Sequence, residues 1–238
     1  MSYGDSYKNW KDWEDNSFGN LSRQDKTYYD AELKGIRSNF EGKKLNVLEI
    51  GYGNGSFLTY CKNKDWDICG LELNEELHKI ALELGYQSKI STNLGDLPSS
   101  SFDIVVAFDV IEHQDREELS DFFRETHELL RPGGYFISRF PNGDSPFSLL
   151  VQNGDLTHKT FIGSESLRYL AIENNYLIEE LRGSAEPIIA GSFVHFFHRL
   201  LSKPIKIFIN LLLSSVYYPG RRKDLSSICL TAILRKPD

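Results

Sequence analysis

The sequence is poor in cysteine, and its cysteines do not form a recognisable set. Cys61, Cys69 and Cys229 are an odd number in a chain of 238 residues, and their spacing is not that of zinc ligands. Two of them fall within or beside expected core elements. We therefore expect buried free thiols in a cytosolic protein, and neither disulfides nor a structural zinc site.

Long hydrophobic runs are also missing. The longest uncharged apolar stretch, residues 207–218, has 12 residues, and a membrane-spanning helix needs about 20. A transmembrane helix is therefore not expected. Met1 is followed by polar and aromatic residues without an apolar core, so we expect no secretory signal. Both absences favour a cytoplasmic protein.

Positive charge is scarce relative to negative charge. The chain has 27 Lys and Arg against 34 Asp and Glu, a net charge of -7. Nucleic acid is not an expected partner, because phosphate binding needs a basic surface. Residues 187–223 differ from the rest, since they contain no Asp or Glu. Their six cations are Arg199, Lys203, Lys206, Arg221, Arg222 and Lys223.

This basic segment is also apolar, and it predicts two short helices joined at Lys203-Pro204, because proline interrupts a helix. The pair can cap the sheet edge or form a dimer contact, lie peripherally at an anionic membrane surface, or cover an acceptor pocket. His195 and His198 share one helical face, but no carboxylate stands near them in sequence. No metal site is expected.

Apolar runs alternate along the chain with amphipathic segments, which predicts alternating strands and helices. Strands are expected over residues 45–50, 66–72, 87–91, 102–108, 134–140, 176–183 and 226–235. Helices are expected over residues 23–40, 56–63, 74–84, 115–130 and 164–174. The alternation implies one α/β domain whose largely parallel sheet is covered by helices on both faces.

The most informative segment is V-L-E-I-G-Y-G-N-G-S-F, residues 47–57. An apolar run opens into glycines at alternate positions, where the backbone turns tightly and approaches a ligand closely. A dinucleotide fingerprint needs a glycine at position 56, which is Ser, so a nicotinamide oxidoreductase is disfavoured. Glu49 would repel a pyrophosphate but suits an ammonium group. These residues favour a nucleoside-bearing ligand that carries a positive charge.

The pattern E-x-G-x-G-x-G resembles motif I of the class I S-adenosylmethionine-dependent methyltransferases. Four further segments resemble that family in the order it requires. They are D-I-C-G-L-E-L-N at residues 67–74, G-D-L at 95–97, F-D-I-V-V-A-F-D-V-I-E-H at 102–113 and L-L-R-P-G-G-Y-F-I-S-R-F-P at 129–141. Together the five segments cover residues 45–141.

The resemblance implies a Rossmann-like three-layer αβα sandwich with a seven-stranded, mostly parallel sheet. Its strand order would be 3-2-1-4-5-7-6, with the last strand antiparallel and a helical insert before it. A single domain would then comprise an N-terminal arm and helix (1–40), a cofactor-binding core (41–183), the basic apolar insert (184–224) and the final strand (225–238).

The resemblance also implies S-adenosyl-L-methionine as the cofactor. Glu49 and the glycine loop would hold its methionine part, Glu72 both ribose hydroxyls, and Asp96 and Leu97 the adenine edge. The complete set of expected cofactor-binding residues is Glu49, Gly51, Gly53, Gly55, Glu72, Leu73, Asp96, Leu97, Phe108 and His113.

The acceptor side depends on the loop G-D-L-T-H-K-T-F, residues 154–161, which follows the fifth strand and so lies at the carboxyl edge of the sheet. His158 can be a general base or acceptor ligand, or can organise the loop by a hydrogen bond. Asp155 can orient that imidazole, bind a sugar hydroxyl, or cap a turn. Both are our candidate catalytic residues.

This loop resembles a methyltransferase subgroup associated with bacterial surface-polysaccharide biosynthesis. The resemblance implies O-methylation of a sugar hydroxyl in a cell-surface glycan or its precursor. Two alternatives stay open: a methyltransferase for a quinone or other small lipophilic acceptor, and a non-catalytic nucleoside-binding module. The protein would be cytoplasmic and could lie at the inner face of the membrane.

Several other polar and aromatic residues have two interpretations each. Asp109 and Asn142 can face the site or serve a turn, and Glu112 and Glu117 are expected to face solvent. The N-terminal aromatic residues can close over the cleft as a lid or pack as an arm on the surface. They are Tyr3, Tyr7, Trp10 and Trp13.

Overall fold

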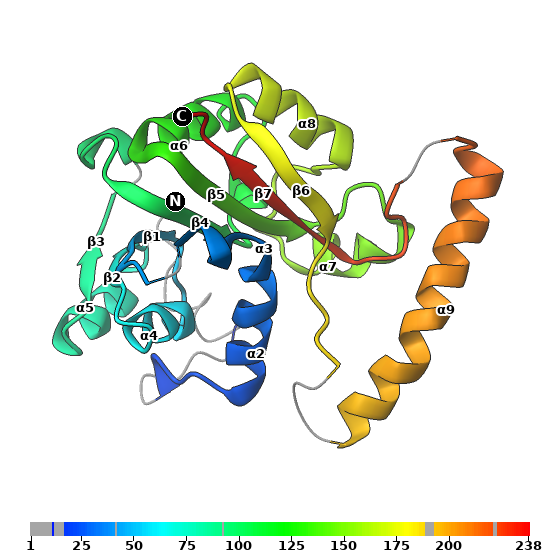
Figure 1. Ribbon diagram of the computed structural model, residues 1–238, viewed down its shortest axis with the longest axis horizontal. Helices are drawn as coiled ribbons and strands as arrows, with labels where there is room; N and C mark the ends of the chain where they lie inside the picture. The colour runs from blue at the N-terminus through cyan, green and yellow to red at the C-terminus, as the bar shows by residue number, and fades with distance from the viewer. Residues whose placement is uncertain (1–10, 12–16, 41, 92, 189–192, 221–222) are drawn as a thin grey trace.

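The computed structural model describes residues 11, 17–40, 42–91, 93–188, 193–220 and 223–238. Its centre is a seven-stranded sheet of order β3-β2-β1-β4-β5-β7-β6 (Figure 1). The strands are β1 (Asn46–Ile50), β2 (Asp67–Leu71), β3 (Gln87–Lys89), β4 (Phe102–Phe108), β5 (Leu130–Pro141), β6 (Leu177–Gly183) and β7 (Cys229–Arg235). β7 pairs antiparallel with both β5 and β6. The predicted strand order and the antiparallel last strand are confirmed.

Helices cover both faces of this sheet (Figure 1). They are α2 (Arg23–Glu32), α3 (Lys34–Arg37), α4 (Ser56–Lys62), α5 (Glu75–Glu83), α6 (Leu119–Leu129), α7 (Leu149–Gly154), α8 (Ser164–Glu173) and α9 (Phe193–Tyr217). One buried cluster joins α6 and α8 to the sheet, and a second joins α2, α4 and α5 to the opposite face. The central strands are buried on both faces, which explains why they read as continuous apolar runs.

The loop after β1 has the backbone that its glycines allow. Gly51, Gly53 and Gly55 all have positive φ, at 69°, 51° and 72°. A Cβ on Gly51 would lie 2.7 Å from a Val110 methyl carbon, and one on Gly55 would lie 2.6 Å from the Phe18 ring. β1 lies between β2 and β4, so this loop opens where the chain reverses its winding, the usual ligand position in open α/β sheets.

The expected helix over residues 23–40 is divided in the structure. α2 ends at Glu32, α3 is a short helix over Lys34–Arg37, and a 3-10 turn follows at Ser38–Phe40. Gly35 lies within this region, and glycine lowers helix stability by about 1 kcal/mol relative to alanine. α7 was not predicted, since its six residues are too few to show a helical period.

The prediction of two short helices in the basic segment is wrong. α9 is one helix of 25 residues with Pro204 inside it. Proline removes one backbone donor but can remain in a helix where water satisfies the freed carbonyl. Phe196–Tyr217 is 22 residues long with a hydropathy of 1.3, and none of it is buried. By length and composition alone, this helix could cross a membrane.

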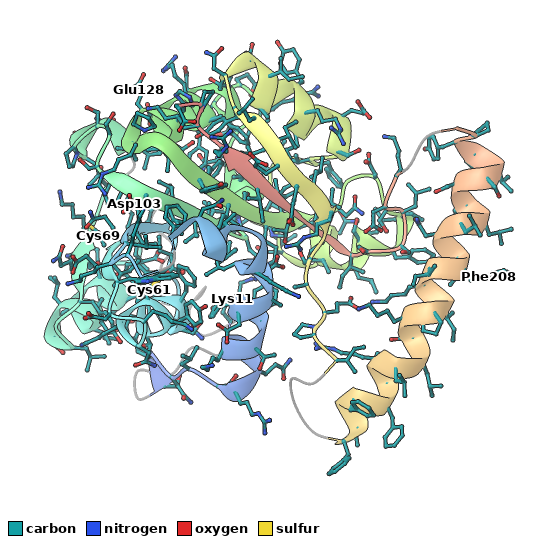
Figure 2. The ribbon with its side chains drawn as sticks, in the orientation of Figure 1. Lys11, Cys61, Cys69, Asp103, Glu128 and Phe208 are labelled. Atoms are coloured by element: carbon teal, nitrogen blue, oxygen red, sulfur yellow. The ribbon has the colours of Figure 1, made fainter. Side chains whose placement is uncertain are left out.

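The three cysteines are free thiols, but only one of them is buried as predicted. Cys61 is buried under the sheet, whereas Cys69 and Cys229 are half-buried. Figure 2 labels Cys61 and Cys69 on the side of the molecule that carries β2 and α4.

Candidate functional site

Two adjoining pockets open at the carboxyl end of the central strands. The inner pocket has a volume of about 180 Å³ and lies between β1, β2 and the start of the turn after β4. The outer cleft has a volume of about 780 Å³ and extends toward α2 and the loop after α7. Gly51, Gly53, Asp109 and His113 line both. A ligand in one pocket therefore borders a ligand in the other.

Glu72 lies in the inner pocket at the end of β2. Its Oε2 accepts a hydrogen bond from Gly53 N at 3.0 Å, and its Oε1 accepts from Leu73 N at 2.8 Å and Asn74 N at 3.0 Å. Burial raises the pKa of Glu72, although these three donors oppose the shift. A carboxylate has about four lone-pair directions. One therefore remains on Oε2 for a hydroxyl of a ligand.

Glu49, on β1, is the least satisfied carboxyl near the glycine loop. It is 4% exposed and lines the outer cleft, and its Oε2 has no hydrogen-bond partner among the described residues. Burial, reinforced by the charge of Glu72, raises the pKa of Glu49 well above its ordinary value. A cationic group placed beside it would favour the ionised form. The arrangement fits the ammonium group expected there.

Asp96 and Leu97, the two residues predicted at the adenine edge, have other surroundings than the inner pocket. The Asp96 carboxylate accepts hydrogen bonds from Ser91 Oγ at 3.0 Å and Asn93 Nδ2 at 3.1 Å. Leu97 is buried in the core. Neither is among the described residues that line the pocket, whereas Ser91 and Leu94 are. Leu73, another predicted cofactor-binding residue, lines this pocket.

Phe108 and His113 lie at the junction of the pockets. The Phe108 ring lines the outer cleft and stacks on Tyr29, with ring centroids 5.9 Å apart. His113 Nδ1 lies 3.2 Å from the Thr157 carbonyl oxygen. Burial lowers the pKa of His113, which favours a neutral imidazole. Gly55, a predicted cofactor-binding residue, is the N-cap residue of α4 and is not among the described residues that line either pocket.

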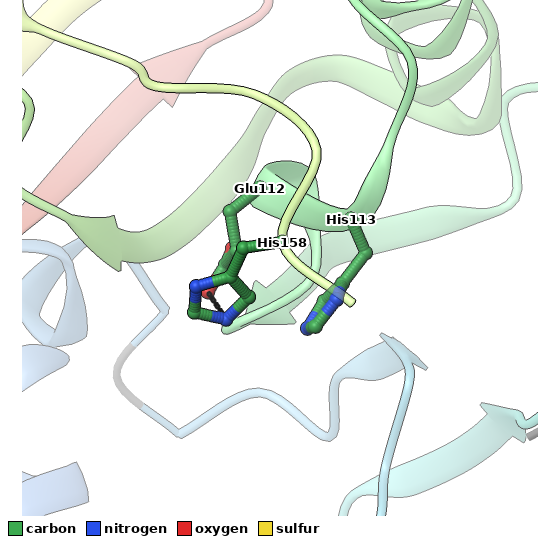
Figure 3. A group of neighbouring side chains, drawn as sticks. All are labelled: Glu112, His113 and His158. Atoms are coloured by element: carbon green, nitrogen blue, oxygen red, sulfur yellow. Dashed lines mark ion pairs between the residues drawn. The ribbon is translucent and has the colours of Figure 1, made fainter. Parts of the chain in front are cut away.

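Glu112, His113 and His158 form a cluster in the outer cleft (Figure 3). Glu112 and His113 come from the turn after β4, and His158 comes from the loop after α7. His158 Nε2 lies 3.9 Å from Glu112 Oε1, and the two imidazole centroids are 4.7 Å apart. We call this set the Glu-His-His cluster.

The expectation that Glu112 faces solvent is wrong, because Glu112 is 1% exposed. The loop after α7 folds over it: the Glu112 carbonyl oxygen accepts hydrogen bonds from Lys159 N at 2.8 Å and Thr160 N at 3.1 Å. Burial, reinforced by Asp109, raises the pKa of Glu112 well above its ordinary value. Glu112 is thus a candidate functional residue that local sequence pattern did not reveal.

Asp155 is buried beside the cluster as the anchor of its loop. Its Oδ1 accepts hydrogen bonds from the backbone and hydroxyl of Thr157, and its Oδ2 lies 3.0 Å from Lys11 Nζ. Burial opposes ionisation, but these partners lower the pKa of Asp155 to about 2. The carboxylate is therefore charged near neutral pH. Its Oδ2 lies 3.8 Å from His158 Nε2.

Arg139 is a second residue that sequence reasoning missed. It extends from β5 into the outer cleft, where it forms a two-point ion pair with Asp109 and lies 5.1 Å from the Tyr28 ring centre. An arginine within the otherwise uncharged segment 135–141 of β5 was the available signal. Asp109 has a φ of 56° and lines both pockets, so it faces the site.

Asn142 was predicted either to face the site or to serve a turn, and in the structure its role is structural. It is fully buried, and its Nδ2 donates to the Asp224 and Ser227 carbonyl oxygens at 2.7 and 3.0 Å. These bonds fix the end of β5 against the segment that leads into β7. The aromatic leader residues Tyr3, Tyr7, Trp10 and Trp13 lie outside the described residues.

Comparison with known families and structures agrees with this geometry. Residues 22–181 match the family model described as methyltransferase domain. No curated protein matches the sequence. Among solved structures, a SAM-dependent methyltransferase from Archaeoglobus fulgidus is similar with a TM-score of 0.64 and 22% identity, over 89% of this chain and 94% of the other.

Two further similar structures differ in what they do. Phosphoethanolamine N-methyltransferase 2 from Haemonchus contortus, solved with S-adenosylhomocysteine, has a TM-score of 0.57 and 15% identity, over 91% of this chain and 58% of its own. The cyclase SpnF has a TM-score of 0.57 and 15% identity, over 92% of this chain and 84% of its own. At such identities the likeness concerns the fold alone, and the acceptor must be argued from the site.

Proposed function

Because the chain belongs to the methyltransferase domain family, with S-adenosylmethionine as its expected cofactor, we propose that it methylates a sugar hydroxyl in a cell-surface glycan or its precursor. The observation that carries this proposal is the junction of the two pockets. Glu72 lines the inner pocket, which we assign to the nucleoside of the cofactor. Glu49, whose Oε2 has no hydrogen-bond partner among the described residues, lines the outer cleft together with the Glu-His-His cluster, where the methionine part would meet the acceptor. Gly51 and Gly53 of the glycine loop line both pockets.

The residues present fit the cofactor in two respects. Glu72 offers its remaining lone pair to a ribose hydroxyl. Glu49 offers the ammonium group of the methionine part a buried oxygen that has no hydrogen-bond partner in the described part of the chain. The bound cofactor supplies a methyl group already activated on a sulfonium sulfur. The protein must therefore align the acceptor oxygen and receive its proton.

His158 is our proposed proton acceptor in that step. Its Nδ1 lies 3.0 Å from the Gln152 carbonyl oxygen, which can only accept, so the ring proton belongs on Nδ1. The lone pair is then on Nε2, and His158 is one of the residues that line the outer cleft. As the acceptor oxygen bonds to the methyl carbon, the bond from that carbon to sulfur would break to leave S-adenosylhomocysteine, and the hydroxyl proton would pass to this nitrogen.

The polar lining of the outer cleft supports a hydroxyl-rich acceptor. Charged or hydrogen-bonding side chains surround the position where it would lie, and a sugar satisfies such groups better than a flat apolar ring. They include Lys11, Asp109, Glu112, Arg139, Asp155 and His158. A quinone or other lipophilic acceptor remains the second candidate, supported by the exposed apolar face of α9.

We further propose that α9 places the protein at the cytoplasmic face of a membrane. An ordinary surface helix turns its apolar face toward the protein and its polar face toward solvent, and α9 has the opposite arrangement. Its polar residues face the protein body. Arg199 donates to the Pro187 carbonyl, Lys206 pairs with Glu186 at 2.6 Å, and Asn210 Oδ1 accepts from Leu225 N at 2.7 Å. Positions 199, 206 and 210 share one face of a helix.

The opposite face of α9 is apolar and exposed. Its members follow the helical spacing of three to four residues, and they are Leu201, Ile205, Phe208, Leu212 and Val216. Phe208 is 64% exposed, and Figure 2 shows it on the side of α9 away from the sheet. Solvated apolar faces of this length favour burial at the boundary of a bilayer.

Flotation with vesicles of phosphatidylglycerol and phosphatidylcholine tests the membrane proposal. Wild type should float with the vesicles, and the double variant Phe208→Glu/Leu212→Glu should remain in the soluble fraction. Leu84→Glu is the matched control, since Leu84 is a half-exposed leucine at the end of α5 and should leave flotation unchanged. Wild-type protein that stays soluble and sediments as a dimer would assign the face to a second copy.

Transfer of a radiolabelled methyl group tests the catalytic proposal. Oligosaccharide and lipid-linked sugar acceptors should become labelled with wild type and not with His158→Ala, while quinone precursors should not. Binding of S-adenosylhomocysteine is measured in parallel by calorimetry. Labelled quinones would favour the second candidate, and binding without labelling of any acceptor would favour a non-catalytic nucleoside-binding module.

A further inference from the structure

The Glu-His-His cluster has a feature that neither cofactor binding nor proton transfer requires. One ligand atom from each of Glu112, His113 and His158 lies within 4.8 Å of the other two. Both Glu112 carboxyl oxygens lack a hydrogen-bond partner among the described residues, although the side chain is almost fully buried. An unsatisfied buried carboxyl is costly. Its position therefore points to a missing cationic partner.

The two imidazoles are held in the orientation that metal ligands adopt. His158 Nδ1 lies 3.0 Å from the Gln152 carbonyl oxygen, and His113 Nδ1 lies 3.2 Å from the Thr157 carbonyl oxygen. Each carbonyl accepts, so each ring carries its proton on Nδ1 and its lone pair on Nε2. A metal-binding histidine commonly donates its second ring N–H to a backbone carbonyl in this way.

We propose that Glu112, His113 and His158 bind one divalent transition-metal ion. Two imidazoles and one carboxylate suit zinc, iron(II) or cobalt(II) better than magnesium, which prefers oxygen ligands. Bonds of about 2.1 Å would hold tetrahedral ligand atoms roughly 3.4 Å apart. The 3.9 Å between His158 Nε2 and Glu112 Oε1 therefore needs only a small side-chain adjustment.

The charges around the cluster are consistent with such an ion. Lys11 and Arg139 both approach it, but Lys11 is paired with Asp155 and Arg139 with Asp109. The carboxyl of Glu112 is left at the centre without an ion pair to a lysine or arginine among the described residues. A divalent ion would supply the positive charge that Glu112 lacks.

A bound ion would change the chemistry of the site, and this consequence rests on the proposed function. His158 Nε2 would be a ligand and would not receive the acceptor proton. Because Glu112, His113 and His158 all line the outer cleft, a hydroxyl oxygen of an acceptor in that cleft could complete the coordination of the ion. A metal ion lowers the pKa of a bound hydroxyl, so the hydroxyl proton would leave to water in the open cleft and no protein base would be needed. Metal binding therefore decides between the two roles of His158.

Titration of the tag-free, chelator-treated full chain with Co²⁺ and with Zn²⁺ tests the proposal. Visible absorption reports the Co²⁺ ligands, and calorimetry reports the Zn²⁺ affinity and stoichiometry. Wild type should bind one ion per chain. Loss of a residue that only hydrogen-bonds to a metal ligand lowers metal affinity about 10- to 100-fold. Loss of a ligand itself should cost more, so Glu112→Gln and His158→Ala should each weaken binding by more than about 100-fold.

Two controls separate this site from adventitious histidines. His127→Ala on α6 and the double variant His195→Ala/His198→Ala on α9 should bind the ion as tightly as wild type. Glu112→Gln and His158→Ala should still bind S-adenosylhomocysteine, which shows that they fold and that the cofactor site is independent. The proposal is overturned if wild type binds no ion, if the two ligand variants bind normally, or if the α9 variant loses binding. Failure to bind S-adenosylhomocysteine would instead contradict the proposed function.

Discussion

Replacement of Glu72 by glutamine should weaken cofactor binding by an amount that the structure defines. Its carboxylate accepts three backbone N–H groups, from Gly53, Leu73 and Asn74, and has one lone-pair direction left for a ribose hydroxyl. Glutamine keeps one oxygen and turns the other acceptor into a donor. The amide N–H would then oppose a backbone N–H, and the glycine loop would lose a tie to β2.

The expected loss of cofactor affinity follows from the hydrogen bond between Glu72 and the ribose hydroxyl alone. A hydrogen bond to a charged group contributes about 1.5–3 kcal/mol, and about 1.4 kcal/mol corresponds to a tenfold change in affinity. Glu72→Gln should therefore raise the dissociation constant for S-adenosylhomocysteine by about 10- to 150-fold. If the substitution also disturbs the backbone at Gly53, the increase in the dissociation constant should lie near the upper end of this range.

Calorimetric titration at neutral pH measures this change, with Glu75→Gln as the matched control. Glu75 is an exposed carboxylate three residues further along, in the first turn of α5, and should leave affinity unchanged. The pH dependence gives a second readout. Because burial raises the pKa of Glu72 above 4.5, and the ionised form is the acceptor, wild-type affinity should fall on acidification sooner than an ordinary glutamate would allow. A Glu72→Gln variant within threefold of wild type would refute the reasoning.

Three further changes test neighbouring parts of the site. Glu49→Gln should lower the affinity for S-adenosylmethionine about tenfold, as measured by calorimetry. The affinity for 5′-methylthioadenosine should not change, because that nucleoside lacks the ammonium group. Equal losses of affinity for both ligands would contradict the role assigned to Glu49. Gly51→Ala should lower the free energy of unfolding, measured by denaturant titration, by about 1–3 kcal/mol more than Gly85→Ala. Both glycines have positive φ, but of the two only Gly51 has a described neighbour, Val110, that an added Cβ would meet. Asp96→Ala should change the affinity for S-adenosylhomocysteine less than threefold by calorimetry, and a loss above tenfold would restore its predicted contact with adenine.

The sheet and the cofactor side could be predicted from the sequence because their signals are local. The positive φ values of the glycine loop restrict those positions to glycine, so the turn is visible in the residues that make it. Glu72 is fixed by the end of its own strand. The strand order itself came from resemblance to a family, because pairing between distant strands leaves little trace in one sequence.

The acceptor side could be predicted only in part because its residues meet through tertiary structure. Glu112 follows a strand in a turn, where a carboxylate is ordinarily solvated. It is buried because Lys159 and Thr160, more than forty residues later, bond to its carbonyl oxygen. The continuity of α9 was missed for a related reason. Proline lowers helix propensity by about 3 kcal/mol, but the contacts of Arg199 and Lys206 with the body lie on either side of it and hold both halves.

The position of α9 bears on the nature of the acceptor. Arg199, together with Glu186 and Pro187 to which the helix is fastened, lines the outer cleft. The face of α9 that we assign to a membrane therefore lies next to a polar cleft that we assign to a sugar. A free monosaccharide would need only the cleft, and a quinone would need only the apolar face. A glycan precursor carried on a lipid would use both, with its sugar beside the Glu-His-His cluster and its lipid in the bilayer that holds Phe208.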